Sequence, residues 1–184
     1  MTDLVERALI FAAKAHEGQK RKYTGEPYIF HCVEVASIVA TVPHTQEMLA
    51  AALLHDTVED TAVTRADLTA EFGGHVSMLV DMVTDVSTPE MGNRAKRKQI
   101  DRDHIALASA EGQTIKLADL ISNTGSIVAR DPDFAKTYMR EKAELLNQMH
   151  KGDRTLYARA ASLLPPPLQL LLSDGTPANW KRTA

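Results

Sequence analysis

The stretch Met48-Leu49-Ala50-Ala51-Ala52-Leu53-Leu54-His55-Asp56-Thr57-Val58-Glu59-Asp60-Thr61 decides how this chain is interpreted. Its apolar half predicts a buried helix, and its polar half places four ionisable side chains within six positions. Residues four apart share a helix face, so His55 is expected to lie with Glu59, and Asp56 with Asp60. Buried charge is costly unless it is paired or metal-bound, so this acidity predicts a divalent metal or a proton-transfer site.

The composition is ordinary for a soluble globular protein. The 184 residues favour one domain with a real core, and 44% of them are apolar and 24% charged. A net charge of -3 gives no general field for nucleic acid or membrane, and no apolar run approaches membrane-spanning length. The apolar patch at 8–13 is short and flanked by charges, which predicts an amphipathic helix and not a secretion signal. The single cysteine, Cys32, excludes an intrachain disulfide and fits a reducing cytosol, so we expect a cytoplasmic protein.

Helical periodicity predicts an all-α fold, with one domain of about eight or more helices. The expected helices cover residues 2–17, 28–42, 46–57, 64–72, 75–86, 93–110, 113–129, 131–150 and 153–164. In the second helix, the side chains expected to face inward are Ile29, Val33, Ala36 and Val39 or Ala40. Thr64 with Asp67 resembles a capping box, and Asp131-Pro132 reads as an N-cap followed by proline. We expect the domain to occupy residues 1–164 and a C-terminal extension to occupy 165–184.

Two further segments supply candidate metal ligands. His31 falls in the first turn of a helix after a basic loop, where a backbone carbonyl is the alternative partner. Asp119 lies inside an apolar helix and shares a face with Lys116 and Asn123, where a Lys116–Asp119 ion pair on a solvated face is the alternative.

Together, His31, His55, Asp56 and Asp119 form a mixed nitrogen and oxygen ligand set. Such a set suits Mn²⁺, Fe²⁺ or Zn²⁺ with positions open to water, which predicts hydrolysis of a phosphate ester or anhydride. The remaining histidines are interpreted as surface or packing residues, namely His16, His44, His75, His104 and His150.

The ordered set His31, His55-Asp56 and Asp119 resembles the H…HD…D pattern of the HD-domain phosphohydrolase superfamily. Longer segments resemble the hydrolase half of RelA/SpoT-type proteins, and most closely the small stand-alone alarmone hydrolases, including the metazoan form. These segments are Gly25-Glu26-Pro27-Tyr28-Ile29-x-His31, 52–61, Phe72-Gly73 and Lys116-Leu117-Ala118-Asp119-x-x-x-Asn123. The resemblance covers roughly residues 5–150.

This resemblance implies an all-α HD fold and Mn²⁺-dependent hydrolysis of the 3′-pyrophosphate of (p)ppGpp to GDP or GTP and pyrophosphate. It implies that the four residues of the ligand set hold the metal. It also implies that Glu59 and Asp60 orient or deprotonate the attacking water, and that Asn123 lies near the nucleotide sugar and 3′-phosphate. The chain carries no synthetase segment, so the resemblance implies that it degrades alarmone and does not make it.

Candidate cations for the substrate phosphates are found in two basic clusters, at 20–22 and 94–98, and at Lys116. Either Arg21 or Lys22 takes the position of the family's basic loop residue, and Arg97 and Lys98 lie where relatives carry a helix with a basic residue near the pyrophosphate. For both clusters a solvated face is the alternative, and Lys116 has Asp119 or Glu59 as alternative partners.

One departure from the family's sequence pattern leaves the identity of the substrate undecided. Relatives usually carry Arg or Lys directly after the ligand aspartate, where this chain has Leu120. The alternatives are therefore a phosphohydrolase acting on another nucleotide such as NADPH, and a non-catalytic alarmone-binding module. The presence of all four ligands and both acids argues against the second alternative.

Overall fold

The structure is a computed structural model that describes residues 3–172, and within these residues the chain is helical. Its extended pairing is limited to one isolated bridge between Lys20 and Pro27. The helices are α1 (Leu4–Ala15), α2 (Ile29–Val39), α3 (Gln46–Leu54), α4 (Thr57–Asp60), α5 (Arg65–Phe72), α6 (Gly74–Val83), the 3-10 helix η1 (Pro89–Met91), α7 (Arg94–Leu107), α8 (Ala110–Arg130), α9 (Pro132–Leu146), α10 (Arg154–Ser162) and α11 (Pro166–Gln169). The all-α expectation of eight or more helices is confirmed.

Side-chain caps fix where several helices begin. Thr64 and Asp67 form the expected capping box at the start of α5, with the side chain of each accepting from the other's backbone N–H. Asp131 caps α9 by accepting from Phe134 N, and Pro132 occupies the first helical position. The N-terminal ends of these helices follow directly from the sequence because the capping groups are local.

The helix predicted over 46–57 is wrong at its C-terminal end. α3 ends at Leu54, His55 and Asp56 form a turn, and α4 begins at Thr57. The Thr57 hydroxyl donates to Leu54 O at 2.7 Å and satisfies a carbonyl that the broken helix leaves free. Consequently His55 is buried while Glu59 is exposed, and the two do not share one helix face.

The inward face of α2 also differs from the expectation. Val33 is 37% exposed and Ala40 is exposed, whereas Cys32, Val35 and Ile38 are buried with Ala36 and Val39. The helix contacts α1, α3 and α8, so its buried surface is wide and includes positions that a single stripe does not predict.

The helix expected to reach His150 ends at Leu146. Residues beyond it turn toward α8, where the Gln113 side-chain oxygen accepts from Lys151 N at 2.8 Å and from Gly152 N at 3.2 Å. A Cβ at position 152 would lie 2.7 Å from Leu117 Cδ1, so the glycine allows this segment to approach α8 closely, and it does not end the helix as expected.

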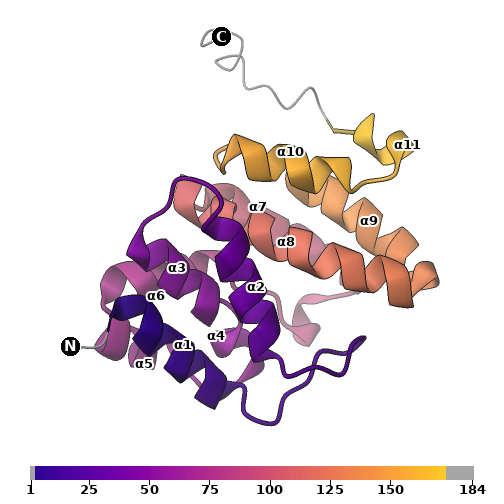
Figure 1. Cartoon of the computed structure of the whole chain (residues 1–184). Helices are drawn as coiled ribbons and strands as arrows, with labels where there is room; N and C mark the ends of the chain where they lie inside the picture. Colours follow the sequence, from indigo (N-terminus) through magenta and orange to yellow (C-terminus); the bar gives the residue numbers. More distant parts are fainter. Residues whose placement is uncertain (1–2, 173–184) are drawn as a thin grey trace, which may run out of the picture.

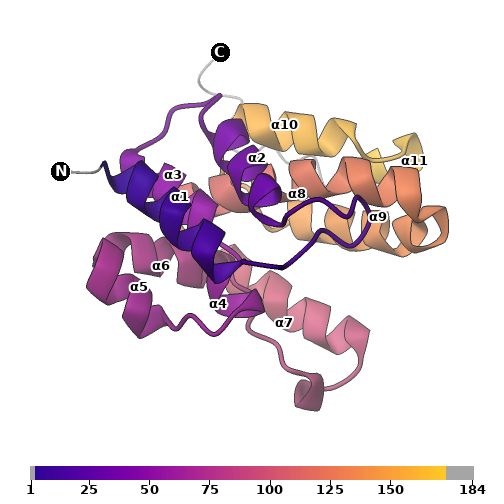
Figure 2. The same cartoon turned by 60° about the horizontal axis from the view of Figure 1, so that its bottom comes forward.

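The long helix α8 organises the molecule and contacts α2, α3, α6, α9 and α10 (Figure 1). Figure 2 shows α1, α3, α5 and α6 gathered on one side of it and α9, α10 and α11 on the other. α11 contacts α9, and Leu168 and Leu172 pack against the core, so the described part of the expected extension is docked. The rest of that extension, 173–184, lies outside the described residues.

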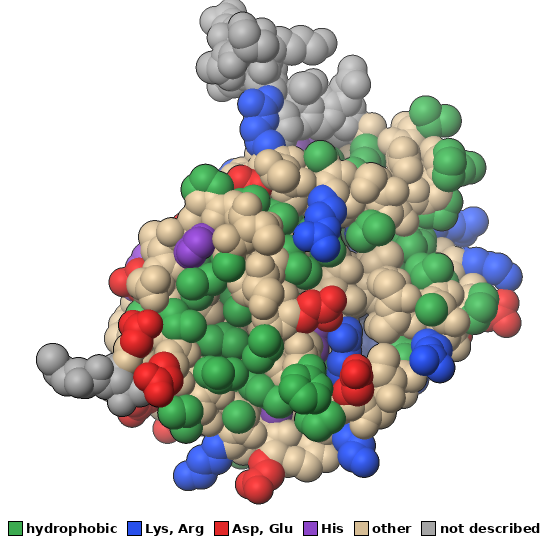
Figure 3. Space-filling view, in the orientation of Figure 1, with side chains coloured by type: hydrophobic (Ala, Val, Ile, Leu, Met, Phe, Trp, Pro, Cys, Tyr) green, Lys and Arg blue, Asp and Glu red, His purple; other side chains and the backbone are tan. Residues whose placement is uncertain are grey.

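Acidic and basic side chains are interspersed over the face shown in Figure 3, and no continuous patch of one sign covers it. Among residues 3–172, none of the helices has the length and apolar character required to cross a membrane.

Candidate metal centre and adjoining cleft

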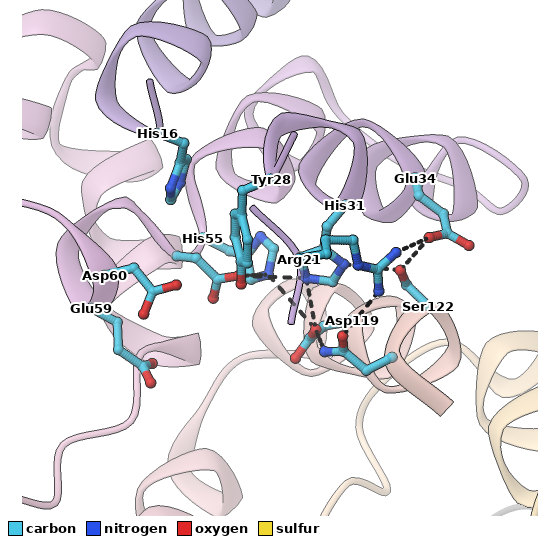
Figure 4. Close-up of polar contacts among 12 residues, drawn as sticks. His16, Arg21, Tyr28, His31, Glu34, His55, Glu59, Asp60, Asp119 and Ser122 are labelled. Carbon is cyan, nitrogen blue, oxygen red and sulfur yellow. Dashed lines mark hydrogen bonds and ion pairs between the residues drawn. The ribbon is translucent and has the colours of Figure 1, made fainter. Parts of the chain in front are cut away.

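The four expected ligand side chains converge on one point. α2 supplies His31, the turn after α3 supplies His55 and Asp56, and α8 supplies Asp119 (Figure 4). His31 Nε2 lies 3.4 Å from Asp56 Oδ2 and 3.3 Å from Asp119 Oδ1. His55 Nε2 lies 2.9 Å and 3.7 Å from the same two oxygens. His31, His55 and Asp56 form a ligand group of metal-site dimensions, and the Asp119 carboxylate adjoins it.

The hydrogen bonds of the two imidazoles direct their Nε2 atoms to this point. His55 Nδ1 lies 2.9 Å from Ala52 O, and a carbonyl only accepts, so Nδ1 carries the proton. His31 Nδ1 lies 2.9 Å from Ser122 Oγ, which replaces the backbone carbonyl expected as the alternative partner. Both Nε2 atoms are buried without a hydrogen-bond partner among the described residues. Buried polar atoms rarely lack a hydrogen-bond partner. The lone pairs of these two nitrogen atoms suit coordination of a divalent cation.

The charges at this point favour a cation. Burial alone raises the pKa of Asp56, but the imidazoles of His55 and His31 outweigh it and hold that pKa well below its usual range. Burial likewise raises the pKa of Asp119, and Lys116 lowers it. The pKa of Asp119 lies well below its ordinary value. Burial lowers the pKa of His55, but Asp56 and Asp119 raise it to about 10. The cluster therefore stabilises positive charge at its centre, which a proton or a divalent cation can supply.

A second layer of side chains holds the two carboxylates. Tyr28 Oη donates to Asp56 Oδ2 at 2.6 Å, and Asn123 Nδ2 donates to Asp119 Oδ1 at 2.6 Å. Lys116 Nζ lies 3.4 Å from Asp119 Oδ2, so the ion-pair alternative holds, although the lysine side chain is only 14% exposed and the pair is not on a solvated face. Tyr28 was not predicted as a site residue, because nothing local in the sequence connects it to Asp56.

Glu59 and Asp60 flank the ligands from the short helix α4 (Figure 4). Glu59 Oε2 accepts from Asp85 N at 3.2 Å, and Asp60 Oδ2 accepts from Gln19 Nε2 at 3.1 Å. Desolvation at this position raises the pKa of Glu59 to about 7, with Asp85 adding to the rise and Lys116 opposing it. A carboxyl with a pKa near neutrality suits proton transfer at physiological pH.

A cavity of about 280 Å³ adjoins the ligand cluster at Asp119. Its lining includes the polar side chains of Asp85, Lys98, Lys116 and Asn123, and Lys98 Nζ donates to Asp85 Oδ2 at 2.6 Å. Phe134, Tyr138 and Lys142 also line it. A cavity that combines cationic and aromatic side chains suits a ligand that carries phosphates and a less polar part.

The structure shows which of the candidate cationic side chains lie at the site and which do not. Arg21 points at the site, with Nη2 donating to Asn123 Oδ1 at 3.3 Å, and its side chain is 12% exposed. Lys22 is exposed, and its Nζ lies 4.9 Å from the centre of the Tyr23 ring. In the second cluster Lys98 and Arg94 line the cavity, and Arg94 also pairs with Glu141, so this segment is not simply a solvated face.

Two carboxylates of the site, those of Asp85 and Glu34, were not predicted from the sequence. Asp85 follows the apolar helix α6 in the way that Asp56 follows α3, so the same signal was present there. Glu34 gives no such signal. Of the five histidines left without a role, His16 is buried, its ring lies 4.9 Å from that of Tyr28, and its Nδ1 lies 2.7 Å from Gln19 Oε1.

A sequence model of the HD domain family matches residues 8–149, so the chain belongs to the HD domain family. A Vibrio cholerae protein named guanosine-3′,5′-bis(diphosphate) 3′-pyrophosphohydrolase is 38% identical over 146 residues, which cover 78% of this chain and 21% of that protein. A Myxococcus xanthus protein named GTP pyrophosphokinase is 37% identical over 127 residues, or 66% of this chain and 17% of that one. The chain thus spans about a fifth of the length of these curated relatives.

A solved structure matches over most of its own length and most of this chain. It is described as a metazoan ortholog of SpoT that hydrolyzes ppGpp, and it superposes with a TM-score of 0.79 at 26% identity. The match covers 89% of this chain and 94% of that one. The resemblance seen in the sequence motifs is therefore confirmed at the level of family and fold.

Proposed function

We propose that this protein is a metal-dependent hydrolase that removes the 3′-pyrophosphate of (p)ppGpp, with Mn²⁺ as its metal. The observation that carries the proposal is the pair of buried Nε2 atoms of His31 and His55, which have no hydrogen-bond partner among the described residues and face two carboxylates beside a cation-lined cavity. The names of the Vibrio relative and the metazoan neighbour support the choice of substrate. Fe²⁺ and Zn²⁺ suit the same ligand set.

In this proposal His31, His55, Asp56 and Asp119 hold the cation, which supplies Lewis acidity at the scissile phosphate. Hydrolysis breaks the P–O bond to the 3′ oxygen. The water oxygen bonds to that phosphorus, one water proton passes to Glu59 or Asp60, and the leaving 3′ oxygen takes up a proton. Glu59 is suited to the proton transfer because its pKa is raised to about 7.

The remaining polar residues of the site bind the substrate in this proposal. Lys98, Lys116 and Arg21 offset the negative charge of the phosphates, and Asn123 orients the sugar beside Asp119. Lys98 and Lys116 are already held by Asp85 and Asp119, so they are preorganised for binding. We place the protein in the cytoplasm, because its single cysteine is buried and unpaired, as in a reducing compartment.

A substrate panel tests the proposal. Purified protein is stripped with a chelator, reloaded with Mn²⁺, and given ppGpp and NADPH in separate reactions. Release of pyrophosphate from ppGpp supports the proposal. His55→Ala, which lacks one of the four proposed metal-binding side chains, serves as the control. Release of orthophosphate from NADPH with ppGpp intact would instead identify the alternative phosphohydrolase. Binding of ppGpp without turnover would identify a non-catalytic module.

A further inference from the structure

Behind His31 lies a chain of hydrogen bonds that includes two residues, Ser122 and Glu34, with no part in the proposed reaction. Ser122 Oγ, on α8, lies 2.9 Å from His31 Nδ1 and donates to Glu34 Oε2 at 2.6 Å. Arg21 Nη1, from the loop before α2, donates to the same Glu34 oxygen at 3.2 Å (Figure 4). Three segments of the chain therefore meet behind one candidate ligand.

The direction of these bonds decides which nitrogen of His31 is free. The Ser122 hydroxyl has one proton, and it is donated to Glu34. Ser122 Oγ must therefore accept from His31 Nδ1–H, which leaves the lone pair on Nε2, the atom that faces Asp56 and Asp119. A carboxylate thus acts on His31 through one intervening hydroxyl, in the position where metal-binding histidines are commonly supported.

The same chain reaches the opposite candidate ligand. The second guanidinium nitrogen of Arg21, Nη2, donates to Asn123 Oδ1 at 3.3 Å, and Asn123 Nδ2 donates to Asp119 Oδ1 at 2.6 Å. His31 on α2 and Asp119 on α8 are therefore joined through Arg21. Only a planar, forked side chain holds two separate acceptors in fixed directions, which a lysine does not do.

We propose that Glu34, Ser122 and Arg21 are positioning residues of the metal centre. Glu34 fixes the orientation of His31 through Ser122, and Arg21 ties this pair to Asn123 and so to Asp119. The inference rests on the proposed function only in requiring that His31 and Asp119 hold a metal, and it does not depend on the nucleotide. The competing account is that these bonds merely join α2 to α8 and leave metal binding unchanged.

Burial along the chain makes the inference testable. Ser122 is 6% exposed, whereas the Glu34 side chain is 48% exposed. Replacing Glu34 therefore removes little packing, and Ser122→Ala removes a single buried hydroxyl. Ser77 is the matched control for Ser122, because it is also buried and its hydroxyl bonds Thr69 and Arg65 O on another side of the molecule. Glu47, partly exposed in the first turn of α3, is the control for Glu34.

The experiment measures Mn²⁺ affinity by competition with a chromophoric chelator, in the absence of nucleotide. Ser122→Ala should weaken Mn²⁺ binding roughly 10- to 100-fold, as losses of such supporting partners do. Glu34→Ala should weaken it as well, Glu34→Gln should recover most of the affinity because it keeps an acceptor oxygen, and Arg21→Lys should show a loss. The double variant Ser122→Ala/Glu34→Ala should lose less affinity than the two single losses combined, because Glu34 acts on His31 through Ser122.

Wild-type affinity in Ser122→Ala and Glu34→Ala would overturn the inference, and so would an equal loss in Ser77→Ala. Melting temperatures of the metal-free variants identify any general loss of fold. Since no nucleotide is present, this outcome is separate from the fate of the proposed function. If the variants lose Mn²⁺ affinity as expected but the protein does not hydrolyse ppGpp, only the proposed substrate is overturned. If the protein hydrolyses ppGpp but the variants keep their Mn²⁺ affinity, only the inference is overturned.

Discussion

Tyr28 donates a hydrogen bond of 2.6 Å from its hydroxyl to Asp56 Oδ2, the oxygen that faces both candidate histidine ligands. Burial, together with the nearby Asp56 carboxylate, raises the pKa of Tyr28 far above its ordinary range, so the phenol keeps its proton and stays a donor. The bond occupies one lone pair of the carboxylate and fixes its orientation. A tyrosine that was not predicted as a site residue thus supports the candidate metal centre.

Tyr28→Phe should weaken Mn²⁺ binding about tenfold and leave the fold intact, because the ring contacts with His16 and His31 survive. Chelator competition gives the affinity, and circular dichroism gives the fold. Unchanged affinity would show that Asp56 does not need this donor.

Glu59→Gln should lower kcat about 10²- to 10⁴-fold with little change in metal affinity, because it removes the proton acceptor and no proposed ligand. In the wild-type enzyme kcat should rise with pH and level off, because Glu59 acts as a carboxylate and its pKa is about 7. A bound cation lowers that pKa, so the midpoint should lie at or below 7. Glu47→Gln is the surface control, and a wild-type rate in Glu59→Gln would remove Glu59 from the mechanism.

At saturating Mn²⁺, which offsets any loss of metal affinity, Arg21→Ala should lower kcat/KM for ppGpp about 10- to 100-fold, the effect of losing a charged hydrogen bond to the substrate. Lys22→Ala should change it less than about threefold, because Lys22 is exposed and rests against the Tyr23 ring. Steady-state kinetics on the two variants separate the neighbours. The reverse order of effects would show that Lys22, and not Arg21, binds the substrate.

Lys142 is 1% exposed, and its ammonium donates to Thr124 Oγ1 at 2.8 Å. Burial lowers its pKa from 10.5 to about 8. Below about pH 8 the folded and unfolded states both hold the proton, and burying the charge destabilises the fold. Between about 8 and 10.5 the unfolded state binds more protons, so this group makes the free energy of unfolding rise with pH.

Lys142→Met should therefore raise the free energy of unfolding at pH 7 by about 1–3 kcal/mol and remove this contribution to the rise above pH 8. Urea unfolding at several pH values measures both effects. A less stable variant at pH 7 would mean that the bond to Thr124 outweighs the burial of charge.

The part of the site that the sequence predicted is the part with local signals. His55-Asp56 ends an apolar helix, and Asp119 interrupts another, so the cost of burying them unpaired identified both segments. These residues and His31 do converge in the fold. Helix starts at Thr64 and Asp131 were likewise visible, because a cap and its acceptor lie within one turn.

What the sequence did not predict depends on partners far apart in the chain. Tyr28 bonds Asp56, and Ser122 joins Glu34 to His31 across two helices, and neither pairing has a spacing that marks it. The break after Leu54 was missed because the polar residues that follow still fit a helical period. Val33 was predicted to face inward because the prediction assumed a single apolar stripe along α2. Three other helices contact α2, so its buried positions do not follow one stripe.

The central claim is that the four converging side chains of His31, His55, Asp56 and Asp119 support hydrolysis at the 3′-pyrophosphate. The most direct measurement is a ³¹P NMR analysis of ppGpp after incubation with the Mn²⁺-loaded protein in ¹⁸O-water. We predict GDP and pyrophosphate in equal amounts, with the ¹⁸O in pyrophosphate and no products from His55→Ala. Intact ppGpp, or orthophosphate in place of pyrophosphate, would contradict the account.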